Sequence, residues 1–199
     1  MTGQFITFEG IEGSGKSTQI KRVAAYLKEK GATPRLTKEP GGTVFGSAVR
    51  QWLLDPESQF QSLHTECCLF YADRFEHVSH VIKPALARGE TVLCDRYYDS
   101  TWAYQVGGRG LSAEMIQHLD QQVDCIPDRT YLLDIPVEDG LARAKARASL
   151  DRFEKEDSSF HQAIREMYLK RAKEAPDRII LINGTGTPDE VFEQIQKTL

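Results

Sequence analysis

Residues 10–17 read Gly10-Ile11-Glu12-Gly13-Ser14-Gly15-Lys16-Ser17, directly after an apolar run and directly before a helical pattern. This order matches the P-loop, in which glycines let successive backbone N–H groups point at phosphate oxygens and the next helix adds the positive end of its dipole. We expect Lys16 to reach the β- and γ-phosphates of a nucleoside triphosphate and Ser17 to place its hydroxyl on Mg²⁺. The predicted triphosphate contacts are Gly10, Ile11, Glu12, Gly13, Ser14, Gly15, Lys16, Ser17 and Thr18.

The length and the charge balance limit what this chain can be. Its 199 residues suffice for one buried core, and we predict a single domain over residues 1–199. The 25 basic side chains face 29 acidic ones, which gives a formal net charge of −4. A chain without an overall positive field does not favour nucleic acid or a membrane surface as its partner. Any site for an anion must therefore be local.

The cysteines and the hydropathy pattern indicate the compartment. The cysteines are Cys67, Cys68, Cys94 and Cys125, and the lack of a C-x-x-C spacing favours thiols in a reducing compartment. No apolar run reaches the ~18 residues of a membrane span. Residues 1–4 lead into a predicted strand rather than into a signal peptide. We therefore expect a cytoplasmic protein.

Short apolar runs alternate with helical patterns along the chain. The predicted strands are residues 5–8, 33–38, 91–94, 130–135 and 178–182. The predicted helices are residues 17–30, 44–54, 64–88 (bent near Pro84), 112–123, 137–148, 160–173 and 188–199. This alternation predicts an α/β fold with a five-stranded parallel sheet flanked by helices. Ligands of such sheets bind beyond the carboxyl ends of the strands, where the P-loop, Glu39 and Asp95 fall.

A P-loop by itself leaves hydrolysis, switching and transfer open. A guanine-selective switch would need an N-K-x-D motif, but Asn183 is the only asparagine and Gly184 follows it. The L-S-G-G-Q signature of transporter ATPases is also missing from the sequence. These two large classes are therefore disfavoured.

Two aspartates end apolar runs and compete for the role of metal carboxylate. We favour Asp95, because Arg96 and Tyr97 extend a polar cluster beside it, whereas Pro136 closely follows Asp134. The alternative for Asp134 is the N-cap of the next helix. The predicted metal ligands are Ser17 and Asp95.

The segment from 143 to 152 is the local basic patch, with Arg143, Lys145, Arg147 and Arg152 beside Asp151. Arginines that arrive on closure of a lid would stabilise the charge of phosphoryl transfer. We predict a lid over about residues 143–155, with Arg147 and Arg152 folding over the triphosphate. A solvated helix face is the alternative, above all for Arg143 and Lys145.

A second group of residues suggests an acceptor for the phosphoryl group. A carboxylate inside a phosphate cradle is unfavourable, so we expect Glu12 to point toward the acceptor. Arginines suit a phosphate, aromatic rings suit a base, and an amide suits hydrogen bonds. The candidates are Arg50, Phe70, Arg74, Arg96, Tyr104 and Gln105. The alternatives are core packing for Phe70 and exposed helix charges for Arg50 and Arg74.

The combination of blocks 8–17, 39–43, 69–74, 95–97 and 100–110 resembles the thymidylate kinase family over nearly the whole chain. The resemblance implies a P-loop nucleoside monophosphate kinase that moves the γ-phosphate of ATP to dTMP, giving dTDP and ADP for dTTP synthesis. An acidic P-loop with arginines in the lid resembles the bacterial type. One departure is Val106, where many bacterial relatives have glycine.

The resemblance also implies roles for single residues. Phe70 would stack on thymine and Arg74 would bind its carbonyl edge, while Arg50 and Arg96 would hold the dTMP phosphate. Ser100, Thr101 and Gln105 would supply polar contacts to the base. Tyr104 would crowd the 2′ position, and Glu12 would meet the 3′-hydroxyl. The full predicted dTMP set is Glu12, Glu39, Pro40, Arg50, Phe70, Arg74, Arg96, Ser100, Thr101, Tyr104 and Gln105.

The chemistry that the resemblance implies needs no general base, because the dTMP phosphate is already an anion near neutral pH. It needs neutralisation of two approaching anions. The predicted catalytic residues are Lys16, Asp95, Arg96, Arg147 and Arg152. The family also implies a homodimer, for which residues 64–88, with Cys67, Cys68, Leu69 and Tyr71, could supply an interface. Core packing is the alternative for that helix.

Overall fold

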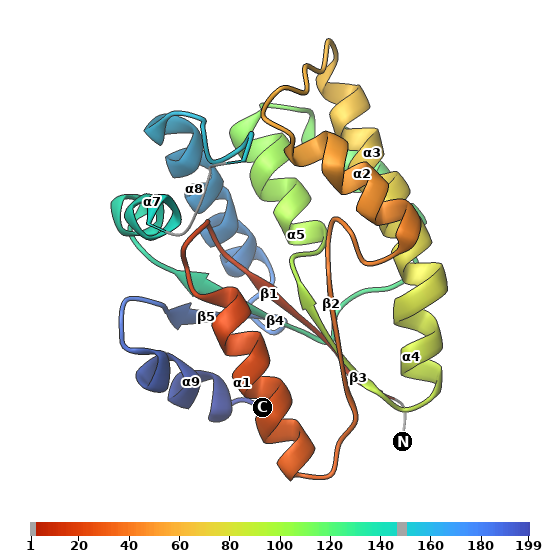
Figure 1. Cartoon of the computed structure of the whole chain (residues 1–199), viewed down its shortest axis with the longest axis vertical. Coiled ribbons are helices and arrows are strands. Elements are labelled where there is room, and N and C mark those ends of the chain that lie inside the picture. The colour runs from red at the N-terminus through yellow and green to blue at the C-terminus, as the bar shows by residue number, and fades with distance from the viewer. Residues whose placement is uncertain (1–2, 147–150) are drawn as a thin grey trace.

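The apolar runs of the sequence form one parallel sheet in the computed structural model, which describes residues 3–146 and 151–199 (Figure 1). The strands are β1 (Phe5–Glu9), β2 (Pro34–Lys38), β3 (Thr91–Asp95), β4 (Arg129–Asp134) and β5 (Ile179–Asn183). Their order is β2-β3-β1-β4-β5, and all neighbours are parallel. The predicted five-stranded α/β fold is thus confirmed. No helix in the described ranges combines the length and the apolar character that crossing a membrane requires.

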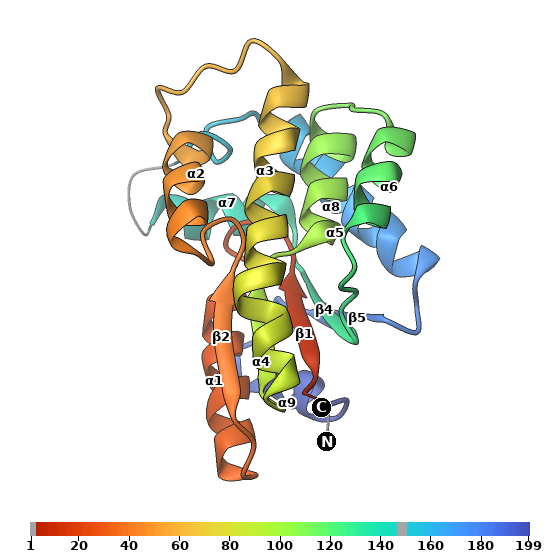
Figure 2. The same cartoon turned by 90° about the vertical axis from the view of Figure 1, so that its right-hand side faces the viewer.

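Helices cover both faces of the sheet. On one face lie α1 (Lys16–Glu29) and α9 (Pro188–Gln196). The other face carries α3 (Leu63–His77), the π-helical segment η1 (Val78–Ile82), α4 (Lys83–Ala87) and α8 (Ser158–Glu174). The remaining helices are α2 (Val44–Leu54), α5 (Tyr98–Thr101), π-helical η2 (Trp102–Gly108), α6 (Ala113–Gln122) and α7 (Val137–Lys145). In Figure 2, α2 lies beside α3 above the end of β2.

The side chains of β1 point alternately to the two faces of the sheet, and each face carries its own part of the core. Phe5 packs with Cys67 and Tyr71 of α3, whereas Ile6 packs with Ile20 and other apolar side chains of α1. Successive side chains of a strand point to opposite faces, so both faces of a covered sheet must be apolar. The burial of Cys67 and Tyr71 means that these two residues serve the core and not an interface; Cys68 is exposed.

Two stretches differ from the predicted elements. The helix expected over residues 64–88 is continuous, but its irregular turn is the π-helical segment Val78–Ile82, just before Pro84. Proline has no N–H for the regular helical bond, and a wide turn accommodates its ring. Residues 98–108, for which the sequence predicted no element, form α5 and η2. The helix expected over 137–148 is described only to Lys145.

Candidate active site

The loop between β1 and α1 wraps closely against neighbouring backbone. Gly10 has a φ of 136°, and a Cβ there would lie 2.4 Å from the carbonyl oxygen of Leu133. Gly13 has a φ of 73°, and its Cβ would lie 2.3 Å from the carbonyl oxygen of Gly140. Only glycine tolerates both the positive φ and this close approach. The predicted P-loop therefore forms a tight cradle before the N-terminus of α1.

Lys16, the first residue of α1, lies across this cradle. Its Nζ donates to the carbonyl oxygens of Gly10 and Ile11, each at 2.9 Å. The side chain is 6% exposed, and burial lowers the pKa of Lys16, with the nearby Arg96 adding to the effect. Its Nζ also donates to the Ser14 hydroxyl at 3.4 Å, and a buried ammonium held by such neutral oxygens is well suited to receive an anion.

Ser17 and Asp95 meet at the carboxyl ends of β1 and β3, where the Ser17 hydroxyl donates to Asp95 Oδ2 at 3.0 Å. The competing Asp134 uses both carboxylate oxygens to accept from Arg165, at 2.7 and 2.9 Å. The N-cap reading of Asp134 is wrong, because α7 begins after Pro136.

A metal ion at Ser17 and Asp95 would need oxygen ligands from elsewhere. Within the described ranges, no group of three or more His, Cys, Asp or Glu side chains could hold a metal ion on its own. Two protein ligands, Ser17 and Asp95, are enough for Mg²⁺, because this ion usually keeps several waters and takes its other ligands from substrate phosphates.

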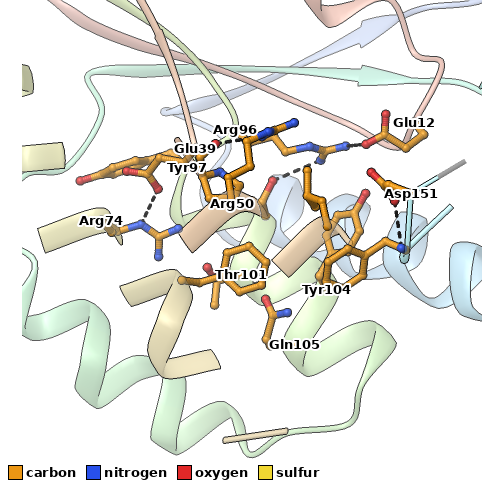
Figure 3. A pocket seen from close by; sticks show the side chains of 15 residues that line it. Glu12, Glu39, Arg50, Arg74, Arg96, Tyr97, Thr101, Tyr104, Gln105 and Asp151 are labelled. Carbon is orange, nitrogen blue, oxygen red and sulfur yellow. Dashed lines mark hydrogen bonds and ion pairs between the residues drawn. The ribbon is translucent and has the colours of Figure 1, made fainter. Parts of the chain in front are cut away.

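A second pocket adjoins the cradle (Figure 3). It lies between β2, α2, α3 and the segment η2. Its lining residues are Glu12, Glu39, Pro40, Arg50, Leu54, Phe70, Arg74, Arg96, Tyr97, Ser100, Thr101, Tyr104, Gln105, Asp151 and Phe153. The cradle and this pocket share Glu12, Glu39, Arg50 and Arg96.

Arg74 of α3 is buried in the wall of this pocket, so its reading as an exposed helix charge is wrong. Its Nε donates to Glu39 Oε2 at 2.8 Å, and its guanidinium lies over the rings of Tyr71 and Tyr97. Among the described residues, Arg74 Nη1 and the hydroxyl of Thr101 have no hydrogen-bond partner. Buried polar groups are nearly always paired, so these two atoms suit a ligand.

Arg96 joins the two pockets from the end of β3. Its backbone has a φ of 69°, the one positive value among the described non-glycine residues. Its Nη1 donates to the carbonyl oxygen of Gly10 at 3.1 Å and to the Tyr168 hydroxyl at 3.0 Å, and its Nη2 pairs with Glu12. A strained residue at such a junction is typical of functional sites.

Glu9 and Tyr168 support Arg96 from behind, and the sequence analysis assigned a role to neither. The carboxylate of Glu9 accepts from the backbone N–H of Tyr97 at 2.7 Å and from the hydroxyls of Ser100 at 2.6 Å and Tyr168 at 3.0 Å. Burial, together with the charge of Asp99, raises the pKa of Glu9 to about 7. Because Tyr168 comes from α8, only the fold reveals this cluster.

We expect Glu9→Gln to flatten the pH dependence of stability. The folded protein holds the Glu9 proton more tightly than the unfolded chain, whose carboxyl keeps a pKa near 4.5. The free energy of unfolding should therefore fall by roughly 3 kcal/mol between about pH 4.5 and about pH 7 through this group. Denaturant titrations of both proteins across that range measure the difference; parallel curves would contradict the assignment.

Arg152 does not lie over the P-loop. Its Nε donates to the carbonyl oxygen of Leu53 at 2.9 Å, and its Nη1 donates to Glu66 Oε2 at 2.6 Å. It is not among the described residues that line the cradle. The structure thus places Arg152 against α2 and α3, contrary to the expectation of an arginine folded over the triphosphate. Arg147 lies outside the described residues.

A third hollow adjoins the cradle on its other side. It is lined by Gly13, Ser14, Gly15, Thr18, Gln19, Arg143, Gly184, Gly186, Pro188 and Val191. Arg143 Nη1 donates to the carbonyl oxygen of Gly13 at 3.4 Å. The sequence predicted no role for the turn between β5 and α9, which contributes Gly184 and Gly186 to this hollow.

Comparison with known proteins connects this geometry to a family. The sequence model described as thymidylate kinase matches residues 8–195. The chain belongs to the thymidylate kinase family. It is 50% identical to proteins named thymidylate kinase from Pseudomonas putida and Pseudomonas syringae pv. tomato, and each alignment covers 100% of this chain and 96% of the relative. A crystal structure of thymidylate kinase from Ehrlichia chaffeensis superposes with a TM-score of 0.83 at 33% identity, over 99% of this chain and 98% of that one.

The resemblance to the thymidylate kinase family predicted a set of dTMP residues, and the structure brings the whole set to one pocket. Each of them, from Glu12 to Gln105, lines the second pocket. Four lining residues were not predicted: Leu54, Tyr97, Asp151 and Phe153. Phe153 lies 6.1 Å from Phe70 and 5.4 Å from Tyr104, measured between ring centroids. The segment after residue 150 thus completes this wall.

Proposed function

We propose that the protein transfers the γ-phosphate of ATP to dTMP, giving ADP and dTDP for dTTP synthesis. The observation that carries this proposal is the junction of the two pockets. A cradle for phosphates and a pocket with aromatic and polar walls meet at Arg50 and Arg96. Two ligands that enter from opposite sides would bring their phosphates together between these arginines, which is the geometry that transfer requires.

ATP would occupy the cradle and the third hollow. Its triphosphate would lie along residues 10–18, with Lys16 on the β- and γ-phosphates. Its nucleoside would lie beside Arg143 and the turn at Gly184, because that hollow opens directly from the cradle at Gly13. A flat guanidinium next to glycine backbone is suited to stacking on a base.

dTMP would occupy the second pocket. Its base would stack on Phe70 and bind Arg74 Nη1 through a carbonyl oxygen, and its phosphate would lie at Arg50 and Arg96. Tyr104 lies under the Arg96 guanidinium, 5.1 Å from the ring centroid, and would crowd the 2′ position. Glu12 would meet the 3′-hydroxyl while it holds Arg96.

The side chains at the junction would serve the transfer by neutralising charge. Lys16 and Arg96 would lie on either side of the γ-phosphate; Lys16 is buried and Arg96 is largely buried, so solvent screens their charges less than at the surface. Ser17 and Asp95 would hold Mg²⁺, which supplies further neutralisation of the phosphates when bound. Arg147 would act from the lid, about residues 143–155.

We further propose a cytoplasmic homodimer built on one domain. The exposed apolar side chains Phe45 and Trp52 of α2 and Leu63 and Phe75 of α3 support an interface on this side of the molecule. The buried free thiols of Cys67 and Cys94 fit a reducing compartment.

The test is ADP release with ATP and Mg²⁺ against dTMP, dUMP, dCMP, AMP and GMP. We expect turnover with dTMP to exceed turnover with dCMP, AMP and GMP, because Arg74 and Gln105 address the hydrogen-bonding edge of the base. Tight ATP binding without turnover on any of these acceptors would reject the transfer reaction and leave only a nucleotide-binding role.

A further inference from the structure

Glu66 of α3 is a buried carboxylate that lies behind the base side of the second pocket. It is 1% exposed. Its Oε1 accepts from Gln105 Nε2 at 3.1 Å, and its Oε2 accepts from Arg152 Nη1 at 2.6 Å. Arg109 Nε also lies 3.6 Å from Oε1. Two guanidiniums and one amide thus surround this buried carboxyl group, and N–H donors face both of its oxygens.

The hydrogen bond to Glu66 fixes the orientation of the Gln105 amide. A carboxylate has no proton to donate, so only the NH₂ end of the amide can face it. The amide oxygen of Gln105 is then left as the atom available to a ligand, and Gln105 lines the pocket. Figure 3 shows Arg74, Thr101 and Gln105 turned toward the same space. The wall therefore offers a donor at Arg74 Nη1 and an acceptor at Gln105 Oε1.

This pair of groups matches one kind of pyrimidine. Thymine and uracil carry an N3–H donor next to a carbonyl oxygen, whereas cytosine carries an N3 acceptor next to an amino group. The Gln105 oxygen would accept from N3–H, but it would meet the lone pair of a cytosine N3. Leaving such buried groups unpaired discriminates strongly between ligands.

We propose that Glu66 is a positioning residue that determines base specificity. By holding the Gln105 amide in one orientation, it makes the pocket accept a base with N3–H and reject cytosine. Glu66 does not touch the substrate and acts only through Gln105. This inference rests on the proposed function, since it concerns the acceptor of that reaction.

Glu66→Gln tests the inference. The new amide has one acceptor oxygen, which the arginines attract, so its NH₂ turns to Gln105 and the Gln105 amide flips. We expect kcat/KM to fall for dTMP and to rise for dCMP, mainly through KM, so that their ratio drops by about tenfold or more. Arg74 still opposes the cytosine amino group, so the preference is not fully reversed. The ratio of dTMP to dUMP should stay constant, because both bases present the same edge.

Glu156→Gln is the matched control. Glu156 Oε1 accepts from Arg109 Nη1 at 2.6 Å in the same cluster, but Glu156 does not hydrogen-bond to Gln105 among the described residues. A general loosening of the cluster would change the dTMP to dCMP ratio in both variants, whereas the proposed role changes it only in Glu66→Gln. An equal change in both would overturn the inference.

Two further variants keep the test decisive. In a Gln105→Ala background, Glu66→Gln should no longer change the ratio, because the group through which it acts is gone. If Glu66→Gln alone does not fold, the test uses the double variant Glu66→Gln, Gln105→Glu. This variant again places an acceptor oxygen toward the base, so its preference for dTMP over dCMP should be restored. An unchanged dTMP to dCMP ratio in a folded Glu66→Gln protein, or no preference for dTMP in the double variant, would reject the role of Glu66. Failure of the unmodified protein to phosphorylate dTMP would instead reject the proposed function.

Discussion

Replacement of Lys16 by alanine is expected to lower kcat by about 10³-fold while the fold remains intact. The Lys16 ammonium is the cation inside the P-loop cradle, where it contacts the carbonyl oxygens of Gly10 and Ile11. During transfer the ammonium would stabilise the negative charge on the γ-phosphate, and an alanine side chain carries no charge to replace it. Because the Lys16 side chain is buried, water compensates poorly for the lost charge.

Steady-state kinetics at saturating ATP and dTMP measure this loss. Lys28→Ala is the matched control, because Lys28 is an exposed residue of the last turn of α1. Lys16 does not line the second pocket, so dTMP binding by calorimetry should change little. Turnover within tenfold of the unmodified protein would remove Lys16 from the reaction.

For Arg96→Ala we expect a loss in kcat of about 10³-fold or more together with a higher KM for dTMP. Arg96 belongs to both pockets, so its removal weakens the binding of the acceptor phosphate and the stabilisation of the transferred group at once. Arg96→Lys should rescue little. A lysine ammonium lacks the planar guanidinium and cannot make the same set of hydrogen bonds to Gly10, Tyr168 and Glu12.

Arg88→Ala provides the control for loss of an arginine, because Arg88 is exposed and its guanidinium pairs with Glu90, far from both pockets. Thermal unfolding of each variant separates catalysis from stability. Equal loss of activity in Arg88→Ala, or an Arg96→Ala protein with unchanged KM for dTMP, would contradict the position given to Arg96.

The fold was predictable because its determinants are local. The glycine spacing of residues 10–15 and the short apolar runs act within a few residues, and the five strands and their parallel pairing agree with the prediction. The segment Trp102–Gly108, for which no element was predicted, depends on distant contacts. A Cβ at Gly107 would lie 2.8 Å from Met167, and one at Gly108 would lie 2.5 Å from Phe160. These glycines let η2 pack closely on α8, which no local pattern reveals.

The residues of the candidate site also fall into those that the sequence indicates and those that only the fold indicates. Arg74 and Gln105 lie in motifs of the sequence that made them candidates, and both line the second pocket. Glu9, Tyr168 and Glu66 act through partners that are far away along the chain, so their importance depends on the packing of α8 and α3. A cluster of basic residues in the sequence does not show where each of them binds. Arg152, which was predicted to fold over the triphosphate, instead pairs with Glu66 of α3.

Arg74 Nη1, buried and without a partner among the described residues, also limits the chemistry of inhibitors. A compound that fills the pocket with hydrocarbon alone would gain from its aromatic walls but would seal this N–H away from water. The penalty of such an unpaired donor, about 1–3 kcal/mol, is as large as the gain from burying one apolar side chain. Fragment screens against this pocket should therefore favour lactams, imides and other heterocycles that place a carbonyl oxygen at this nitrogen.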